Sequence, residues 1–139
     1  MKIITKELIY KTKGDSEIID LTLDLNKLLI ETKLSEGNCT VFSIGSTGGI
    51  TTLEYEPGLL KDIPSFLDKI IPKYEKYFHN DTWGDGNGHS HIRSAIFKTS
   101  LTIPFAKKLF FLGTWQQVVF IDFDNRPRTR RIIAQFIGE

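Results

Sequence analysis

The sequence predicts an α+β fold, in which one β-rich domain contains an antiparallel sheet or sandwich and two main helices. Three observations support this class. Runs rich in β-formers recur along the whole chain, helical periodicity is strong in only two segments, and no β-α-β repeat is present. The length of 139 residues, with 40% hydrophobic and 25% charged residues, suits a single domain spanning 1–139 around one hydrophobic core.

The chain opens with two predicted strands and a helix. Residues 2–10 and 16–21 are β-rich, and Lys13-Gly14-Asp15 between them predicts a hairpin turn because glycine tolerates a positive φ. Residues 22–35 then carry leucines at helical spacing, and Gly37 follows as a terminator. We therefore expect a β-hairpin followed by the first main helix.

The middle of the chain repeats this order of strands and helix. Residues 39–44 and 50–55 predict two strands joined by a glycine-rich turn. Residues 59–71 place apolar side chains three and four positions apart, which indicates an amphipathic helix that ends before Pro72. We expect the apolar face of this second main helix to pack on the sheet.

The remaining segments are one polar stretch and a series of strands. Apolar residues nearly vanish between His79 and His91, where three glycines alternate with polar residues, so this stretch is expected to be a loop. A short helical stretch is expected at 92–97. The predicted strands after it are residues 99–105, 109–124 and 128–137, the last two joined by a turn at Asn125-Arg126-Pro127.

Charge and composition exclude several classes of function. A formal net charge of +1 gives no general attraction to nucleic acid or to an anionic membrane, so neither is expected as a partner. No apolar run approaches membrane-spanning length, and charged residues interrupt the first seven positions, so a cytoplasmic protein is expected. Cys39 is the single cysteine, which rules out an intrachain disulfide and a paired-cysteine zinc site.

The polar stretch is the first candidate for chemistry because it contains all three histidines of the chain, His79, His89 and His91. Imidazole and carboxylate are good ligands for divalent metals, and a set of two histidines and one carboxylate leaves coordination positions open. His79, Asp81 and His91 could supply that set for a divalent ion such as Zn or Mg. In the alternative interpretation these residues form a solvated glycine-rich turn whose side chains satisfy backbone donors.

Two further groups of residues could bind a ligand. Trp115 beside Gln116 could stack on a flat ring and recognise its polar edge, or Trp115 could be a core or interface aromatic. Arg128 and Arg130 share one face of an extended chain, and guanidinium groups bind phosphate bidentately. A charged, solvated strand edge explains the same run, unless the fold brings Arg93 to it.

Taken together, these motifs resemble the YjbQ-like family, the "secondary thiamine-phosphate synthase" proteins. The resemblance covers essentially the whole chain. It is carried by the stretch from His79 to Arg93, by Gly113-Thr114-Trp115-Gln116-Gln117, and by the basic run from Arg128 to the terminal Gly138-Glu139. It implies a compact β-rich α+β domain that assembles as a homotrimer, with the polar motif residues in one site near the subunit boundaries.

The resemblance also implies a weak thiamine-phosphate synthase activity, which joins hydroxymethylpyrimidine pyrophosphate to a thiazole phosphate and releases pyrophosphate. Two functions follow: a transferase acting on phosphorylated heterocycles or, in the alternative, a non-catalytic homotrimer that binds a small anion or a metal. The candidate catalytic residues are His79, Asp81, His91 and Arg93, and the candidate substrate-binding residues are Asn87, Trp115, Gln116, Arg128 and Arg130.

One position departs from the family pattern. Many members have a His-Thr-Ser-type motif where this chain has Ser46-Thr47-Gly48-Gly49, so a histidine ligand of the family is missing here. The metal would then depend on His79, Asp81 and His91 alone, or it has been lost. Glu54 or Glu56 could compensate for the missing ligand.

Overall fold

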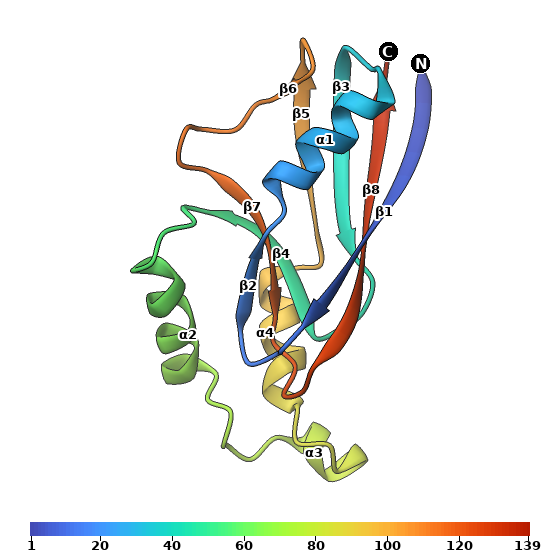
Figure 1. The fold of residues 1–139 in the computed structure, drawn as a ribbon. Coiled ribbons are helices and arrows are strands. Elements are labelled where there is room, and N and C mark those ends of the chain that lie inside the picture. Colours follow the sequence, from blue (N-terminus) through green and yellow to red (C-terminus); the bar gives the residue numbers. More distant parts are fainter.

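The computed structural model describes residues 1–139 and confirms the α+β class, with two antiparallel sheets and short helices (Figure 1). The larger sheet has the strand order β1-β8-β3-β5-β6, and the smaller has the order β2-β7-β4. The strands are β1 (Lys2–Thr12), β2 (Glu17–Asp20), β3 (Glu36–Ser43), β4 (Gly48–Leu53), β5 (Ser100–Ala106), β6 (Leu109–Phe110), β7 (Gln117–Asp122) and β8 (Arg128–Gly138). The helices are α1 (Thr22–Thr32), α2 (Leu59–Ile70), α3 (Phe78–Trp83) and α4 (Gly88–Phe97).

The turn after β1 does not close a hairpin, so that prediction was wrong. β1 pairs along its length with β8, whereas β2 pairs with β7 in the other sheet. Gly14 adopts φ +84°, and a Cβ at this position would lie 2.5 Å from the carbonyl oxygen of Asp124. The turn is therefore a tight corner that carries the chain from the larger sheet to the smaller one. The connections from β3 to β4 and from β7 to β8 also change sheet.

The main hydrophobic core lies between α1 and the two sheets. Leucines of α1 pack with residues of β3, β5 and β8 from the larger sheet and of β4 and β7 from the smaller sheet. The lone thiol of Cys39 is fully buried within this core, which raises its pKa to about 12. The fully buried members include Leu21, Leu25, Leu29, Val41, Val118, Phe120, Ile132, Ala134 and Phe136.

A second apolar cluster lies on the other face of β7, so the expectation of one core needs correction. Side chains of β7 alternate between the two clusters: Val118 and Phe120 point into the main core, and Val119 and Ile121 point into the second. Leu67 of α2 and Ile71, the residue directly after α2, complete this second cluster. β7 is thus buried on both faces, which explains its continuous apolar sequence.

The predicted loop from His79 to His91 is largely helical, which corrects another expectation. Only residues 84–87 separate α3 from α4. The helical pattern was not visible because α4 packs through small polar residues instead of apolar ones. The Ser94 hydroxyl donates to the Gly48 carbonyl at 2.6 Å, and a Cβ at Gly88 would lie 2.6 Å from the Cβ of Tyr77. The backbone of α4 therefore lies close to its neighbours, and the helix packs without the apolar stripe that usually marks a buried helix face.

The helices are distributed unevenly over the molecule. In Figure 1, α1 lies across the half that holds both termini, and α2, α3 and α4 gather around the opposite half. No helix has the length and apolar character needed to cross a membrane. The outward-facing side of the larger sheet has no helix packed on it in the core clusters, and it exposes Ile3, Ile9, Phe42 and Ile137.

Two adjacent residues of α1 test the packing of the main core. Leu29 is fully buried and Ile30 is 63% exposed. Leu29→Ala should lower the free energy of unfolding by roughly 2–5 kcal/mol, because it removes buried methyl groups and leaves a cavity. Ile30→Ala, the matched control, should change it by about 0.5 kcal/mol or less. Urea denaturation would measure both, and equal effects would contradict this placement of α1.

Candidate functional site

The fold brings together two of the predicted site histidines. His79 on α3 and His91 on α4 have ring centroids 4.2 Å apart, with their planes tilted by 36°. The helices are held in this arrangement by Asn80, whose side-chain oxygen accepts a hydrogen bond from the Gly88 N–H at 2.9 Å. Residues twelve positions apart thus form an imidazole pair because the chain reverses direction at Gly84 and Gly86, both of which have positive φ.

The carboxylate beside this pair belongs to Asp85, whereas Asp81 was predicted. Asp85 Oδ1 lies 3.6 Å from His79 Nδ1, and Asp81 is an exposed residue of α3. No group of three or more His, Cys, Asp or Glu side chains in the molecule is arranged to hold a metal ion. The predicted set of His79, Asp81 and His91 therefore does not fit a three-ligand metal site.

His91 lies in the wall of a cavity of about 300 Å³. Burial lowers the pKa of His91, the neighbouring His79 lowers it further, and Asp124, Asp85 and a backbone hydrogen bond at Ser46 partly oppose these effects. His91 is therefore neutral at pH 7, with one ring nitrogen able to donate and the other able to accept. The cavity is lined by Gly45, Ser46, His91, Ser94, Ala95, Lys98 and Thr99.

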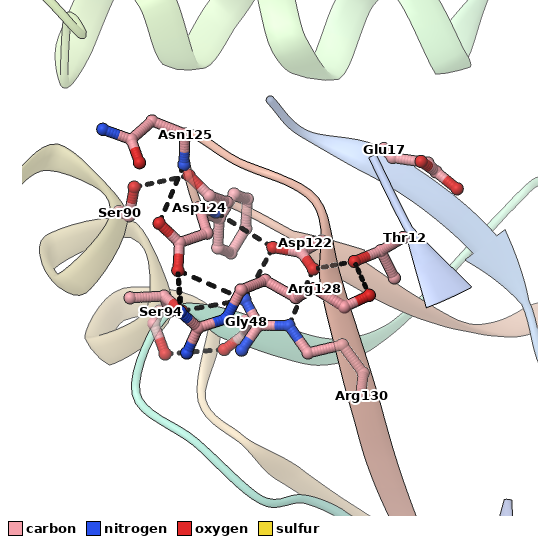
Figure 2. A network of polar contacts seen from close by, with 12 residues as sticks. Thr12, Glu17, Gly48, Ser90, Ser94, Asp122, Asp124, Asn125, Arg128 and Arg130 are labelled. Carbon is pink, nitrogen blue, oxygen red and sulfur yellow. Dashed lines mark hydrogen bonds and ion pairs between the residues drawn. The ribbon is translucent and has the colours of Figure 1, made fainter. Parts of the chain in front are cut away.

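A buried ion pair lies at the seam between the two sheets (Figure 2). Arg130 of β8 donates from Nε and Nη2 to the two carboxylate oxygens of Asp122 of β7, each at 2.7 Å. Thr12 donates to the same carboxylate at 2.5 Å, and Arg130 Nη2 also donates to the Thr47 hydroxyl at 2.8 Å. The guanidinium predicted to bind phosphate is thus already engaged by the protein.

Asp124 forms a second centre of this network and connects it to α4. Burial raises the pKa of its carboxyl, but hydrogen bonds from the Asn125 N–H, Asn87 and Thr47, with the charge of Arg128, outweigh that effect and hold the pKa below its usual value. Asn87 Nδ2 donates to Asp124 at 3.3 Å, and Arg128 Nη1 lies 3.6 Å from it. Asn87 and Arg128 therefore meet at Asp124, next to the start of α4.

Arg93 does not join the other arginines. It is buried under α2, where its Nε and Nη2 donate to the Ile71 carbonyl and Nη2 also bonds Asp68 at 2.8 Å. Nη1 donates to the Ser16 hydroxyl at 3.0 Å. The arginine thus fastens α4 to the end of α2 and to the turn before β2. The fold therefore does not bring Arg93 to the basic run that contains Arg128 and Arg130.

Trp115 and Gln116 lie in the loop that precedes β7, away from the imidazole pair. Trp115 is 72% exposed, so it is not a core residue of this chain. Gln116 Nε2 donates to the Thr52 hydroxyl at 3.1 Å, and its Oε1 accepts from the Gly113 N–H. Gln116 also lines a cleft of about 460 Å³ between β4 and β5. The two neighbours therefore differ, since only Gln116 faces a cavity.

Sequence reasoning missed the acidic side of this region. The Asp122-Phe123-Asp124 run at the end of an apolar strand was a visible signal, because charges that end a buried strand need partners. His89 was also misjudged as a loop residue. It is 1% exposed, and burial with the nearby charges of Arg93 and Lys73 lowers its pKa to about 4. His89 is therefore a neutral, buried side chain behind the site.

Comparisons with known proteins agree with this architecture. A family described as "UPF0047 protein YjbQ-like" matches residues 6–139. A UPF0047 protein of Methanothermobacter thermautotrophicus is 36% identical over 100% of this chain and 95% of its own length. A yjbq/upf0047 family structure from Clostridium acetobutylicum is 35% identical, with a TM-score of 0.87 over 95% of this chain and 99% of that one. A "YbjQ-like protein of unknown function" from Sulfolobus solfataricus has the same fold, with a TM-score of 0.94 at 24% identity over 99% of both chains.

The seam ion pair can be tested by removing one partner. Arg130→Met should lower the free energy of unfolding by about 3–5 kcal/mol, because it leaves the buried Asp122 carboxylate without its counter-charge. Adding Asp122→Asn should recover part of the loss. Arg131→Met, a control at the next residue, removes an exposed pair with Glu7 and should leave the denaturation midpoint almost unchanged. An Arg130→Met protein as stable as the parent would contradict this role.

Proposed function

The chain belongs to the UPF0047 protein YjbQ-like family, and from its histidine site we propose that it is an enzyme acting on phosphorylated heterocycles. The proposed reaction is of the thiamine-phosphate synthase type, a transfer with release of pyrophosphate. The observation that carries the proposal is the imidazole pair of His79 and His91, with neutral His91 facing a cavity. Such a pair offers both a donor and an acceptor to one ligand.

The chemistry required of the site is modest. The ring nitrogen of the thiazole forms a C–N bond with its lone pair, while the C–O bond to pyrophosphate breaks and its electron pair leaves with the phosphate oxygen. An N–H of neutral His91 stabilises that oxygen. His79 packs against His91 and so limits the orientation of the His91 ring.

Replacing His91 is the direct test. His91→Asn should reduce turnover of the two thiamine precursors by roughly 10²- to 10⁴-fold, the usual loss when a positioned acid-base group is removed. Asp85→Asn should lower turnover less, and Asp81→Asn, a matched control in the same segment, should retain the parental rate. The rate of pyrophosphate release measures all three. A His91→Asn rate equal to that of the parent would reject the assignment.

The pH profile gives the same test an independent readout. Because the pKa of His91 is lowered, His91 titrates in the free enzyme below the ordinary histidine value of 6.5, so the limb of kcat/KM that reports His91 should lie below pH 6.5. Retention of a phosphorylated ligand without turnover at any pH would favour the alternative, a non-catalytic protein that binds a small anion. A cytoplasmic location stays a prediction beside either function.

We also propose that the chain assembles as a homotrimer through the open face of the larger sheet. A hollow of about 420 Å³ on this face is lined by Thr40, Phe42, Ile44, Ile133 and Gln135, with no charged residue among them. The exposed Ile3, Ile9 and Ile137 extend the apolar surface. The Glu7–Arg131 ion pair lies beside this hollow on the same face, which carries no helix. An apolar hollow with charged residues at its edge is suited to contact with another protein surface.

The assembly is tested by light scattering after size exclusion. The parental protein should have about three times the 15.9 kDa mass of the chain. Phe42→Lys, which places a charge on the open face, should give a smaller species. Phe66→Lys, at a similarly exposed aromatic residue on α2, should leave the mass unchanged. A monomeric parent, or a Phe42→Lys protein of parental mass, would contradict the proposed interface.

A further inference from the structure

Lys98, directly after α4, adopts a backbone conformation that residues other than glycine rarely adopt. Its φ is 71° and its ψ is 158°. The surrounding structure imposes this geometry, because the Lys98 N–H donates to the Ser94 carbonyl at 2.9 Å and the Lys98 carbonyl accepts from the Ile50 N–H at 3.0 Å. Strained residues of this kind gather at functional sites, where the side chain justifies the cost. A glycine would serve the backbone better, so the side chain of Lys98 needs an explanation.

The position of Lys98 supplies one. Lys98 lines both the cavity that holds His91 and the larger cleft that holds Gln116, so the two hollows meet at this residue. The cleft is formed by β4, β5 and the loop before β7, and its apolar members include Ile50, Leu101 and Phe111. Thr52, Thr102 and Gln116 add polar groups at its wall.

The charges of these linings point to the chemistry of the ligand. No Asp or Glu lines either hollow, and Lys98 is their only permanently charged residue. Lys98 also takes part in none of the ion pairs of the molecule, unlike Arg93, Arg128 and Arg130. An unpaired ammonium between two hollows without carboxylates favours an anionic group at their junction.

We propose that Lys98 binds the phosphate of a bipartite ligand, with the phosphate at the junction of the two hollows and the heterocyclic ring in the cleft beside Gln116, which leaves the His91 cavity free for the departing pyrophosphate. This proposal rests on the proposed function. It assigns phosphate binding to Lys98 in place of Arg128 and Arg130. The arginines are held by Asp122, Asp124 and Asp68, which leaves Lys98, an exposed residue, as the one cationic residue in the lining of the two hollows.

Calorimetric titration with thiazole phosphate and with inorganic phosphate tests this assignment. Lys98→Ala and Lys98→Gly should each weaken thiazole phosphate binding roughly ten- to hundredfold, as expected for loss of one charged hydrogen bond. Lys98→Arg should keep most of the affinity. Gln116→Ala should weaken binding of thiazole phosphate and leave inorganic phosphate unaffected, because only the former has a ring to place in the cleft.

Stability measurements separate a ligand-binding role from a structural one. Lys98→Gly should unfold at a temperature no lower than the parent, since glycine adopts this backbone conformation without strain. Its ligand affinity should nevertheless fall. Lys33→Gly is the matched control: Lys33 also caps a helix with positive φ, at 61°, and its replacement should leave ligand affinity at the parental value.

Two results would overturn the proposal: thiazole phosphate affinity unchanged in Lys98→Ala, or no binding of thiazole phosphate by the parent. Its failure is distinguishable from failure of the proposed function. If turnover depends on His91 but binding does not depend on Lys98, only the assignment of Lys98 is rejected. If binding depends on Lys98 but no turnover occurs, the assignment of Lys98 is kept and the proposed enzymatic function is rejected.

Discussion

The bidentate ion pair between Arg130 and Asp122 is the contact on which the rest of the structure depends. The chain changes sheet at several corners, and this pair joins β8 of one sheet to β7 of the other where the corners meet. Thr12 of β1 and Thr47 of the β3–β4 connection bond to the same pair. A buried charge is tolerated only when its partners are complete, so every segment that supplies a partner is constrained in position.

The same seam determines where the candidate site can form. Asp124 follows Asp122 by two residues and holds Asn87, which lies immediately before α4. The Ser90 hydroxyl donates to the carbonyl of the intervening Phe123, so the first turn of α4 is fixed against the end of β7. His91 is thereby directed to the cavity, and Lys98 reaches the junction of the two hollows at the end of the same helix. The polar network thus positions the site from behind and is not itself free to bind a ligand.

Much of the fold was accessible from the sequence, and the errors share one cause. The apolar periodicity of α1 and α2 predicted both helices, and runs rich in β-formers predicted β1, β3 and β8. The hairpin at Gly14 was wrong because a turn signal specifies a change of direction and carries no information about which strand becomes the neighbour. The first turn of α4 was read as loop, whereas residues 92–97 were predicted as helical. The buried face of that first turn consists of Gly88, His89 and Ser90, whose packing depends on partners far away in the chain.

The sequence by itself determined the fold class and the family pattern, because periodicity and motif spacing are local properties. It also identified the histidines at 79 and 91 as candidates, whereas the contact between their rings depends on the reversal of the chain between α3 and α4. Only the tertiary structure decided that Asp85 stands beside His79, that Arg93 and Arg130 are engaged by Asp68 and Asp122, and that Lys98 lies between two hollows. These choices depend on which buried charges find each other across the sheets. That outcome is set by burial and distance in three dimensions, which no spacing along the chain encodes.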